Sequence, residues 1–137
     1  MTDLSWEEAM TRLTAAQRDF VNGDATGIKR LFSHAEDVTV LGGFGGFEHG
    51  WKEVGPRLDW AASHFAGGSY SQETLSATVG SDVACLVTLE RWSYATPQQR
   101  QETLLELRVT QAFRREEGEW RLVHRHADPL LHKQEPS

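Results

Sequence analysis

The sequence predicts an α+β domain in which a curved antiparallel sheet wraps around three N-terminal helices. Two observations predict this class. Apolar residues recur every three or four positions in segments up to Phe65, and they alternate with polar residues at period two in the segments that follow. Because the helices come first and the strands then follow one another, a meander of strands is favoured over alternating β-α-β units.

Three helices are expected in the first half of the chain. Ser5 and Glu8 have the spacing of a capping box, and the apolar positions after them step by three or four. Asp24 is placed to cap a short second helix. A third helix is expected over 51–65, with Pro56 near its start, where the missing N–H is tolerated.

The remaining segments are expected to be strands. Val38–Leu41 is predicted as the first, and the glycine-rich stretch Gly42–Gly50 is typical of a turn or bulge. Four long antiparallel strands follow, separated by polar turns, at about 69–79, 83–94, 102–114 and 120–128. We expect the polar tail, about 131–137, to be loose.

Length and composition indicate a single domain and argue against nucleic-acid binding and membrane insertion. The length fits one domain over residues 1–137. With a formal net charge of −6 the chain lacks the basic face that nucleic acids require, so no nucleic-acid partner is expected. It has no basic region followed by an apolar leader and no long apolar segment, so we expect a cytoplasmic protein without membrane contact. Cys85, the only cysteine, lies in an apolar run and is expected to be buried.

The last predicted strand carries the strongest chemical signal. His124, His126 and Asp128 stand at alternate positions, so we expect them to share a face with Leu122 and to point toward the helices. One interpretation makes His126 or Asp128 an acid/base in a pocket, because burial moves such pKa values across neutrality. A metal site and a satisfied polar interior are the alternatives; since the other histidines show no ligand spacing, no metal is predicted.

The neighbouring strand supplies Arg108 and Thr110 on one face. If that face is turned inward, Arg108 could hold a carboxylate, enolate or phosphate of a ligand. The other interpretation is a salt bridge from Arg108 to Glu90 on the strand beside it.

Aromatic residues suggest the walls of a pocket. Trp60 and His64 lie four residues apart on the third helix and could form one wall, although aromatic core packing gives the same spacing. Phe44, Phe47 and Trp51 could cover the pocket mouth or lie at a dimer contact.

Nucleotide and covalent chemistry have little support. Glu48 stands where the dinucleotide fingerprint requires glycine, and no GKS or GKT triplet occurs. No serine elbow is present either, so neither a cofactor nor a covalent nucleophile is predicted.

Several motifs, taken in order, resemble the nuclear transport factor 2 (NTF2-like) superfamily, in particular its SnoaL-like and ketosteroid-isomerase-like branch. The motifs are Phe20–Asp24, Leu31–Phe32, Asp37–Val40, Gly50–Trp51, Leu107–Thr110 and Glu117–Asp128. The last is similar to the closing hairpin of kinase association-domain-like members, where Gly-x-Trp-x-x-x-His-x-His recurs. The resemblance implies a cystatin-like cone with a cavity for a small organic molecule, in a homodimer formed through the outer sheet face.

This sequence departs from two catalytic patterns of that superfamily. Gly42 stands where steroid isomerases carry their aspartate base, and Arg108-Val109-Thr110 lacks the aspartate that limonene-type epoxide hydrolases carry. The first hypothesis is therefore a lyase, isomerase or cyclase in which His126 or Asp128 moves a proton and Arg108 binds developing negative charge. The alternative is a non-catalytic ligand-binding or assembly domain, and whether the chain is an enzyme stays open.

Overall fold

The computed structural model describes residues 5–136, so the ends of the expected domain, 1–4 and 137, lie outside it. The described helices are α1 (Trp6–Phe20), α2 (Thr26–Leu31) and α3 (Trp51–Ala62). The described strands are β1 (Thr39–Leu41), β2 (Glu48–His49), β3 (Gly68–Val79), β4 (Val83–Thr96), β5 (Gln99–Glu116) and β6 (Glu119–Pro129). None of these helices is long and apolar enough to cross a membrane.

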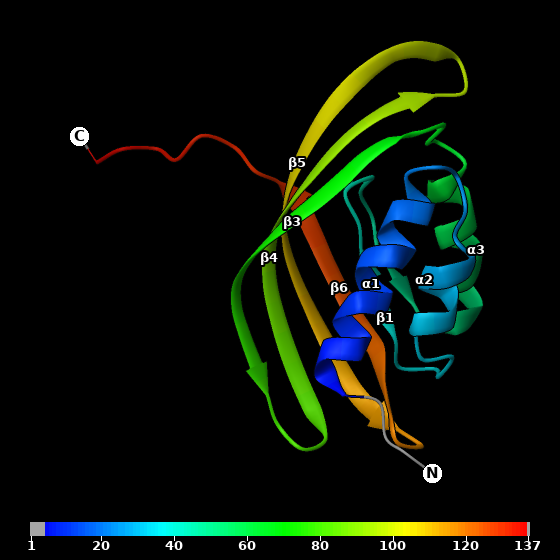
Figure 1. The fold of residues 1–137 in the computed structure, drawn as a ribbon, viewed down its shortest axis with the longest axis vertical. Helices are drawn as coiled ribbons and strands as arrows, with labels where there is room; N and C mark the ends of the chain where they lie inside the picture. Colours follow the sequence, from blue (N-terminus) through cyan, green and yellow to red (C-terminus); the bar gives the residue numbers. More distant parts are fainter. Residues whose placement is uncertain (1–4, 137) are drawn as a thin grey trace.

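The strands form one sheet in the order β2-β1-β6-β5-β4-β3. Strands β3 to β6 make the expected antiparallel meander, but β1 pairs with β6 in parallel, so the sheet is mixed and not wholly antiparallel. Figure 1 shows the three helices on the concave side of this curved sheet, which confirms the α+β cone. The segment 130–136 forms no helix or strand and extends away from the sheet.

The predicted cap of α1 is present, whereas α2 has Ala25 at its N-cap position, without a side-chain cap, and Asp24 lies one residue earlier. The Ser5 hydroxyl accepts a hydrogen bond from the Glu8 amide at 3.1 Å, and the Asp24 carboxylate accepts one from the Thr26 amide at 2.9 Å. Helix α3 ends at Ala62, three residues earlier than expected, because the chain turns there and brings Phe65 against the sheet.

The core lies between the helices and the inner face of the sheet. Apolar side chains of α1 and α3 pack there against alternate residues of β4, β5 and β6. The largest fully buried apolar side chains are Trp120, Phe32, Phe113, Leu13, Ile28, Leu86 and Leu122. The ring of Trp6 closes this core at the start of α1, 5.1 Å from the ring of Phe113 in an edge-to-face contact.

A β-bulge in β6 decides which residues enter the cone. Leu122 pairs with Phe113 and His124 pairs with Ala112, so Val123 is an extra residue without a partner on β5. An extra residue reverses the alternation of side chains along the strand. Leu122 therefore points inward while His124, two positions later, points outward, although regular alternation predicts the same face for both.

The outer face of the sheet is partly apolar. Leu75 on β3, Val83 on β4 and Leu104 on β5 are exposed, and so is Cys85, two residues after Val83. The expectation that Cys85 is buried is wrong: its neighbours Ala84 and Leu86 face the core, so the alternation of β4 turns Cys85 outward.

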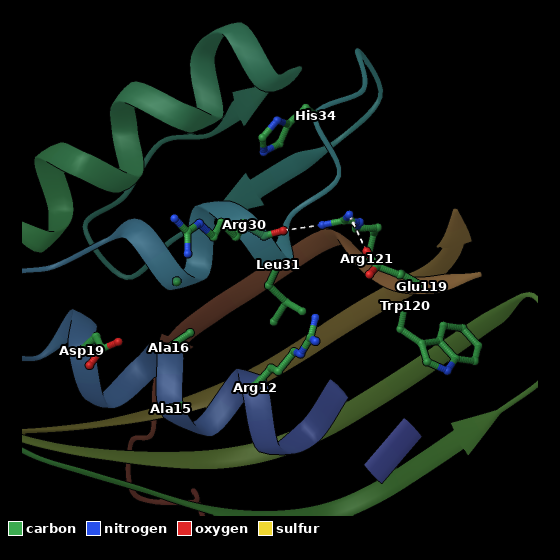
Figure 2. A pocket seen from close by; sticks show the side chains of 11 residues that line it. Arg12, Ala15, Ala16, Asp19, Arg30, Leu31, His34, Glu119, Trp120 and Arg121 are labelled. Carbon is green, nitrogen blue, oxygen red and sulfur yellow. Dashed lines mark hydrogen bonds and ion pairs between the residues drawn. The ribbon is translucent and has the colours of Figure 1, made fainter. Parts of the chain in front are cut away.

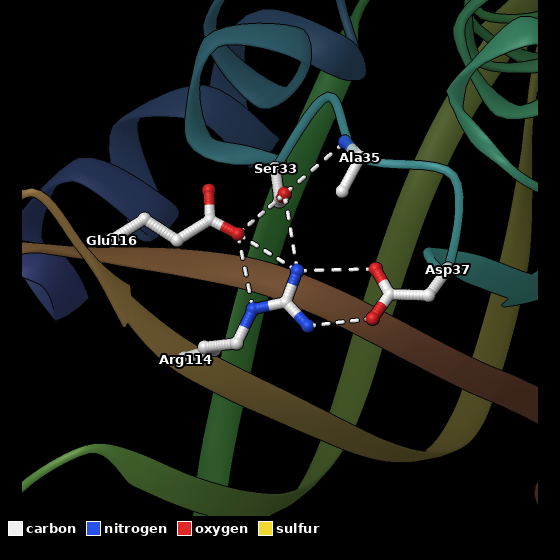
Figure 3. A network of polar contacts seen from close by, with 5 residues as sticks. All are labelled: Ser33, Ala35, Asp37, Arg114 and Glu116. Carbon is white, nitrogen blue, oxygen red and sulfur yellow. Dashed lines mark hydrogen bonds and ion pairs between the residues drawn. The ribbon is translucent and has the colours of Figure 1, made fainter.

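Arg114 joins the loop before β1 to the end of β5 (Figure 3). Its guanidinium donates to both carboxylate oxygens of Asp37, at 2.7 and 3.1 Å, and to Glu116 at 2.7 Å. Ser33 donates to the same Glu116 oxygen at 2.8 Å. The hydrogen bonds from Arg114 hold the pKa of Asp37 below its ordinary value. This network fixes the segment after α2 against the sheet.

Gly68 gives a direct test of the backbone geometry. Its φ is 144°, and a Cβ there would overlap the carbonyl oxygen of Ser93 on β4. We expect Gly68→Ala to lower the free energy of unfolding by roughly 2–4 kcal/mol, measured by urea denaturation. Gly45→Ala is the control, because Gly45 has a φ of 92° with no atom near the added Cβ, and it should cost only about 1 kcal/mol. Equal losses would contradict the close approach of β3 and β4.

Candidate functional site

A group of polar side chains lies inside the cone, on the inner face of β3 to β6. We call Tyr70, Glu90, Trp92, Gln111 and Arg125 the interior polar cluster. At its centre, Arg125 donates to both carboxylate oxygens of Glu90, at 2.7 and 2.9 Å. The Glu90 side chain is 0% exposed and that of Arg125 is 11% exposed, so this bidentate pair is shielded from water.

The remaining members complete the coordination of this pair. The Trp92 indole N–H donates to Glu90 at 3.0 Å, and the Tyr70 hydroxyl lies within donating distance of Glu90 at 3.2 Å. Arg125 also donates to the Gln111 side-chain oxygen at 3.2 Å. The single Tyr70 proton is shared with the Gln72 side-chain oxygen, which lies 2.6 Å from the same hydroxyl. Glu90 therefore accepts two bonds from Arg125 and one from Trp92, with Tyr70 as a shared donor, which compensates for much of the cost of burying its charge.

The charge states of the cluster do not change near neutral pH. Burial by itself raises the pKa of Glu90, but the charge and hydrogen bonds of Arg125, with donation from Trp92 and Tyr70, outweigh burial and bring that pKa below its ordinary value. Burial, followed by the charge of Glu90, raises the pKa of Tyr70. Burial opposes the charge of Arg125, yet Glu90 raises its pKa overall. Glu90 and Arg125 stay charged and Tyr70 stays neutral near neutral pH.

Three buried side-chain polar atoms have no hydrogen-bond partner within residues 5–136. One is the indole nitrogen of Trp120, and the two beside the interior polar cluster are the side-chain nitrogen of Gln111 and the hydroxyl oxygen of Thr88. Gln111 and Thr88 are both fully buried. Thr88 pairs with Val109 across β4 and β5, two positions from Gln111, so the two unpaired groups occupy neighbouring positions of the sheet.

Aromatic rings lead from this cluster toward the surface. The ring of Trp92 stacks on that of Phe65 at 5.3 Å, and Phe44 from the glycine-rich loop lies 6.2 Å from Phe65. Phe44 in turn contacts the rings of Trp60 and His64, each at 5.2 Å. Phe44 and Trp60 are partly exposed, so these rings form the outer end of an aromatic wall.

Trp51 lies away from that wall. Its ring stacks on His34 at 3.9 Å, at the beginning of α3, whereas Trp60 is near the end of the helix. At 1.5 Å per residue the helix separates the two positions by about 14 Å. The expectation that Trp51 covers the same mouth as Phe44 is therefore wrong.

The structure also corrects the predicted orientation of the β6 residues. His126 and Asp128 point to the outer face, with side chains 49% and 42% exposed. His124 lies on the same face, where its ring nitrogen is 2.7 Å from the Thr39 hydroxyl. Partial burial, followed by the charge of His126, lowers the pKa of His124. The bulge at Val123 turns these three side chains out and turns Arg125 in.

Arg108 and Thr110 lie on the outer face as well. Arg108 donates to Asp128 at 2.9 Å and is 62% exposed, so the expected salt bridge from Arg108 to Glu90 is wrong. Leu89 is the partner of Arg108 in the ladder, and Glu90 turns to the opposite side of β4. Arg108, Thr110, His126 and Asp128 instead line an open groove of about 420 Å³ on the outer face.

Of the interior polar cluster, only Glu90 was recognised from the sequence as a site residue; Arg125, Tyr70, Trp92 and Gln111 were not. One feature of the sequence does point to a buried polar site. Gln111 continues the inward alternation of Leu107, Val109 and Phe113, and a polar residue at a core position indicates a buried polar partner. Within the described residues, no three His, Cys, Asp or Glu side chains lie close enough together to hold a metal ion.

The model of the SnoaL-like domain family matches residues 7–131. The chain belongs to this family. Among solved structures, a candidate calcium/calmodulin-dependent protein kinase type II association domain from Thiobacillus denitrificans superposes with a TM-score of 0.74 at 17% identity, covering 96% of this chain and 99% of that chain. A search of curated protein sequences found no match.

Other NTF2-like structures agree with this SnoaL-like assignment. One is an NTF2-like superfamily protein from Salmonella enterica, with a TM-score of 0.71, 14% identity and coverage of 95% of this chain and 96% of that chain. Another is a dehydratase candidate from Streptomyces avermitilis, with a TM-score of 0.70, 18% identity and coverage of 92% and 97%. At these identities the structures show the fold of the SnoaL-like chain and not its activity.

The buried pair predicts unequal costs for two carboxylate substitutions. Glu90→Gln leaves the charge of Arg125 buried without its partner, so we expect the free energy of unfolding to fall by about 3–5 kcal/mol. Asp128→Asn, the control, breaks the exposed pair with Arg108 and should cost about 1 kcal/mol or less. Urea denaturation measures both. Similar losses would show that the interior pair is not shielded from water.

The low pKa of Glu90 also predicts a pH dependence. Because its folded pKa lies below the ordinary value of 4.5, ionised Glu90 stabilises the fold above that value, and this contribution is lost as the pH falls through the folded pKa. A double variant, Glu90→Leu with Arg125→Met, removes the titrating group. Between about pH 6 and about pH 3 the original chain should lose more stability than this variant. Parallel pH profiles would contradict the assignment.

Proposed function

We propose that this SnoaL-like protein binds a small, neutral organic molecule inside the cone, with a ligand oxygen accepting a hydrogen bond from the side-chain nitrogen of Gln111. The observation that supports this most directly is that two neighbouring buried groups, Gln111 Nε2 and Thr88 Oγ1, find no partner in the part of the chain that the structure describes. A buried donor without a partner costs about 1–3 kcal/mol, so an oxygen that reaches it gains most of that energy.

The surroundings favour a neutral ligand with an apolar body. The charges of Glu90 and Arg125 compensate each other within the cluster, so a charged ligand would find no free counter-charge there. At the inner end of the aromatic wall, Phe65 and Trp92 contact each other and Phe20. Their rings suit an alicyclic or aromatic body. A carbonyl or hydroxyl oxygen supplies the acceptor that Gln111 lacks.

Binding is favoured over proton transfer because no member of the interior polar cluster titrates near neutral pH. Glu90 is held ionised, and Tyr70 is held protonated by burial and by Glu90. A general acid or base is most effective when its pKa lies close to the working pH. We therefore favour the non-catalytic alternative over the acid/base enzyme.

Other expectations stay predictions. If His126 and Asp128 are catalytic, their substrate would bind in the outer groove and not inside the cone. The homodimer is an expectation for the same partly apolar outer face. The cytoplasmic location also stays a prediction.

Movement of the glycine-rich loop would give a ligand access to the cone. Phe44 is flanked by Gly43 and Gly45, and it covers Phe65 at the outer end of the aromatic wall. Gly45 and Gly46 have positive φ values of 92° and 65°, and a Cβ at either would meet no atom within 4 Å. Rotation of this loop would move Phe44 off the wall without breaking strand pairing.

Binding can be tested with 2-naphthol and 2-acetylnaphthalene as neutral bicyclic probes in isothermal titration calorimetry. We expect Gln111→Leu, which removes the donor and keeps a similar shape, to weaken binding about tenfold, as expected for one buried hydrogen bond. Gln101→Leu, an exposed position on β5, is the control and should bind as the original chain does. If neither probe binds, or if both variants bind equally, the proposal fails.

A further inference from the structure

We propose a second ligand site, outside the cone, that binds an organic anion through its carboxylate or phosphate group. The site is an open cavity of about 610 Å³ between α1, α2 and the beginning of β6. Figure 2 shows Arg12 from α1, Arg30 and Leu31 from α2, and Arg121 from β6 around this space. None of its lining residues belongs to the interior polar cluster, so the two sites are independent.

Positive charge predominates in the cavity. Three guanidiniums, those of Arg12, Arg30 and Arg121, face two carboxylates, those of Asp19 and Glu119. Glu119 accepts a hydrogen bond from Arg121 at 2.6 Å and so neutralises that guanidinium. The chain as a whole has a formal net charge of −6, so this local excess of positive charge runs against the general balance of the protein.

Arg121 is fixed and serves as a support. Besides its pair with Glu119, it donates to the main-chain carbonyl of Arg30, and this bond joins the end of α2 to β6. In contrast, no hydrogen bond or ion pair within residues 5–136 holds the guanidinium of Arg12 or Arg30. Two planar donor forks are therefore available to a ligand, in the geometry that matches carboxylate and phosphate oxygens.

Small residues form the floor beneath these side chains. Ala16 of α1 meets Gly27 of α2: a Cβ on Gly27 would lie only 3.1 Å from the Cβ of Ala16 and 3.8 Å from a carboxylate oxygen of Asp19, which marks the edge of the floor. Ala15 lines the cavity as well. Leu31 adds an apolar side. A floor of this kind can bury a flat apolar body while the rim holds the anionic group, so the cavity fits an aryl or alkyl carboxylate or phosphate better than a bare ion.

The test is calorimetric titration of the full chain with phenyl phosphate, benzoate and inorganic phosphate as separate probes. We expect phenyl phosphate or benzoate to bind at least about tenfold more tightly than inorganic phosphate, because only the former bury a ring on the floor. Stronger binding of phenyl phosphate than of benzoate would identify phosphate as the preferred group, and the reverse would identify carboxylate. If none of the three probes binds, the proposal is overturned.

Variants locate the site. Arg12→Gln combined with Arg30→Gln should weaken binding of the aryl probe by at least about tenfold, as expected for lost charge-assisted hydrogen bonds. Arg18→Gln, on α1 but outside the cavity, is the charge-matched control and should leave binding unchanged. Gln111→Leu should also leave it unchanged, which separates this site from the cone. Equal weakening by Arg18→Gln would show non-specific charge attraction and overturn the proposal.

Discussion

Val123 is an extra residue in β6, and the interior of the cone depends on it. Up to Leu122 the strand presents alternate residues to the core, and beyond the bulge it presents the opposite set. Arg125 enters the cone for this reason and meets Glu90 there. Without the extra residue His124 and His126 would face the helices, and Glu90 would have no cation beside it.

The ion pair that results gives the interior a particular character. A bidentate pair with further donors from Trp92 and Tyr70 is rigid, and it carries little net charge toward its surroundings. Such a pair is weak evidence of stability, because desolvation offsets much of the attraction. Its effect is to fix the positions of its neighbours, among them Gln111, whose side-chain nitrogen is left available.

The two proposed sites differ in whether their charged side chains are already paired. Inside the cone the charges are paired and the free capacity is one neutral donor and a hydroxyl, which suits a neutral ligand. At the helical cavity the guanidiniums of Arg12 and Arg30 have no hydrogen-bond or ion-pair partner among residues 5–136 and lie above a floor of alanine and glycine, which suits an anion. In the outer groove Arg108 and Asp128 pair with each other and are exposed to water. The groove therefore offers neither a buried free donor nor an unpaired guanidinium as strongly.

Much of the fold could be predicted from local pattern. The cap at Ser5, the three helices and the four long strands follow from side-chain periodicity and turn residues, which act over a few neighbouring positions. Glu90 was also recognised as a site residue. Arg108 was assigned as its partner because the register of β5 on β4, which pairs Arg108 with Leu89, was not known. Arg125 was missed because alternation was carried through Val123 as though β6 were regular. Cys85 was misplaced because an apolar run does not say which of its residues face the core.

By itself the sequence determined the class of fold, the order of its elements and the polar character of β6, because those properties depend on residue type and spacing. Only the tertiary structure decided the register of β6 on β5, the parallel pairing of β1 with β6 and the grouping of Arg12, Arg30 and Arg121. These depend on hydrogen bonds and packing between segments that are far apart in the chain. No local pattern contains that information, since a shift of one residue reverses every side chain that follows it.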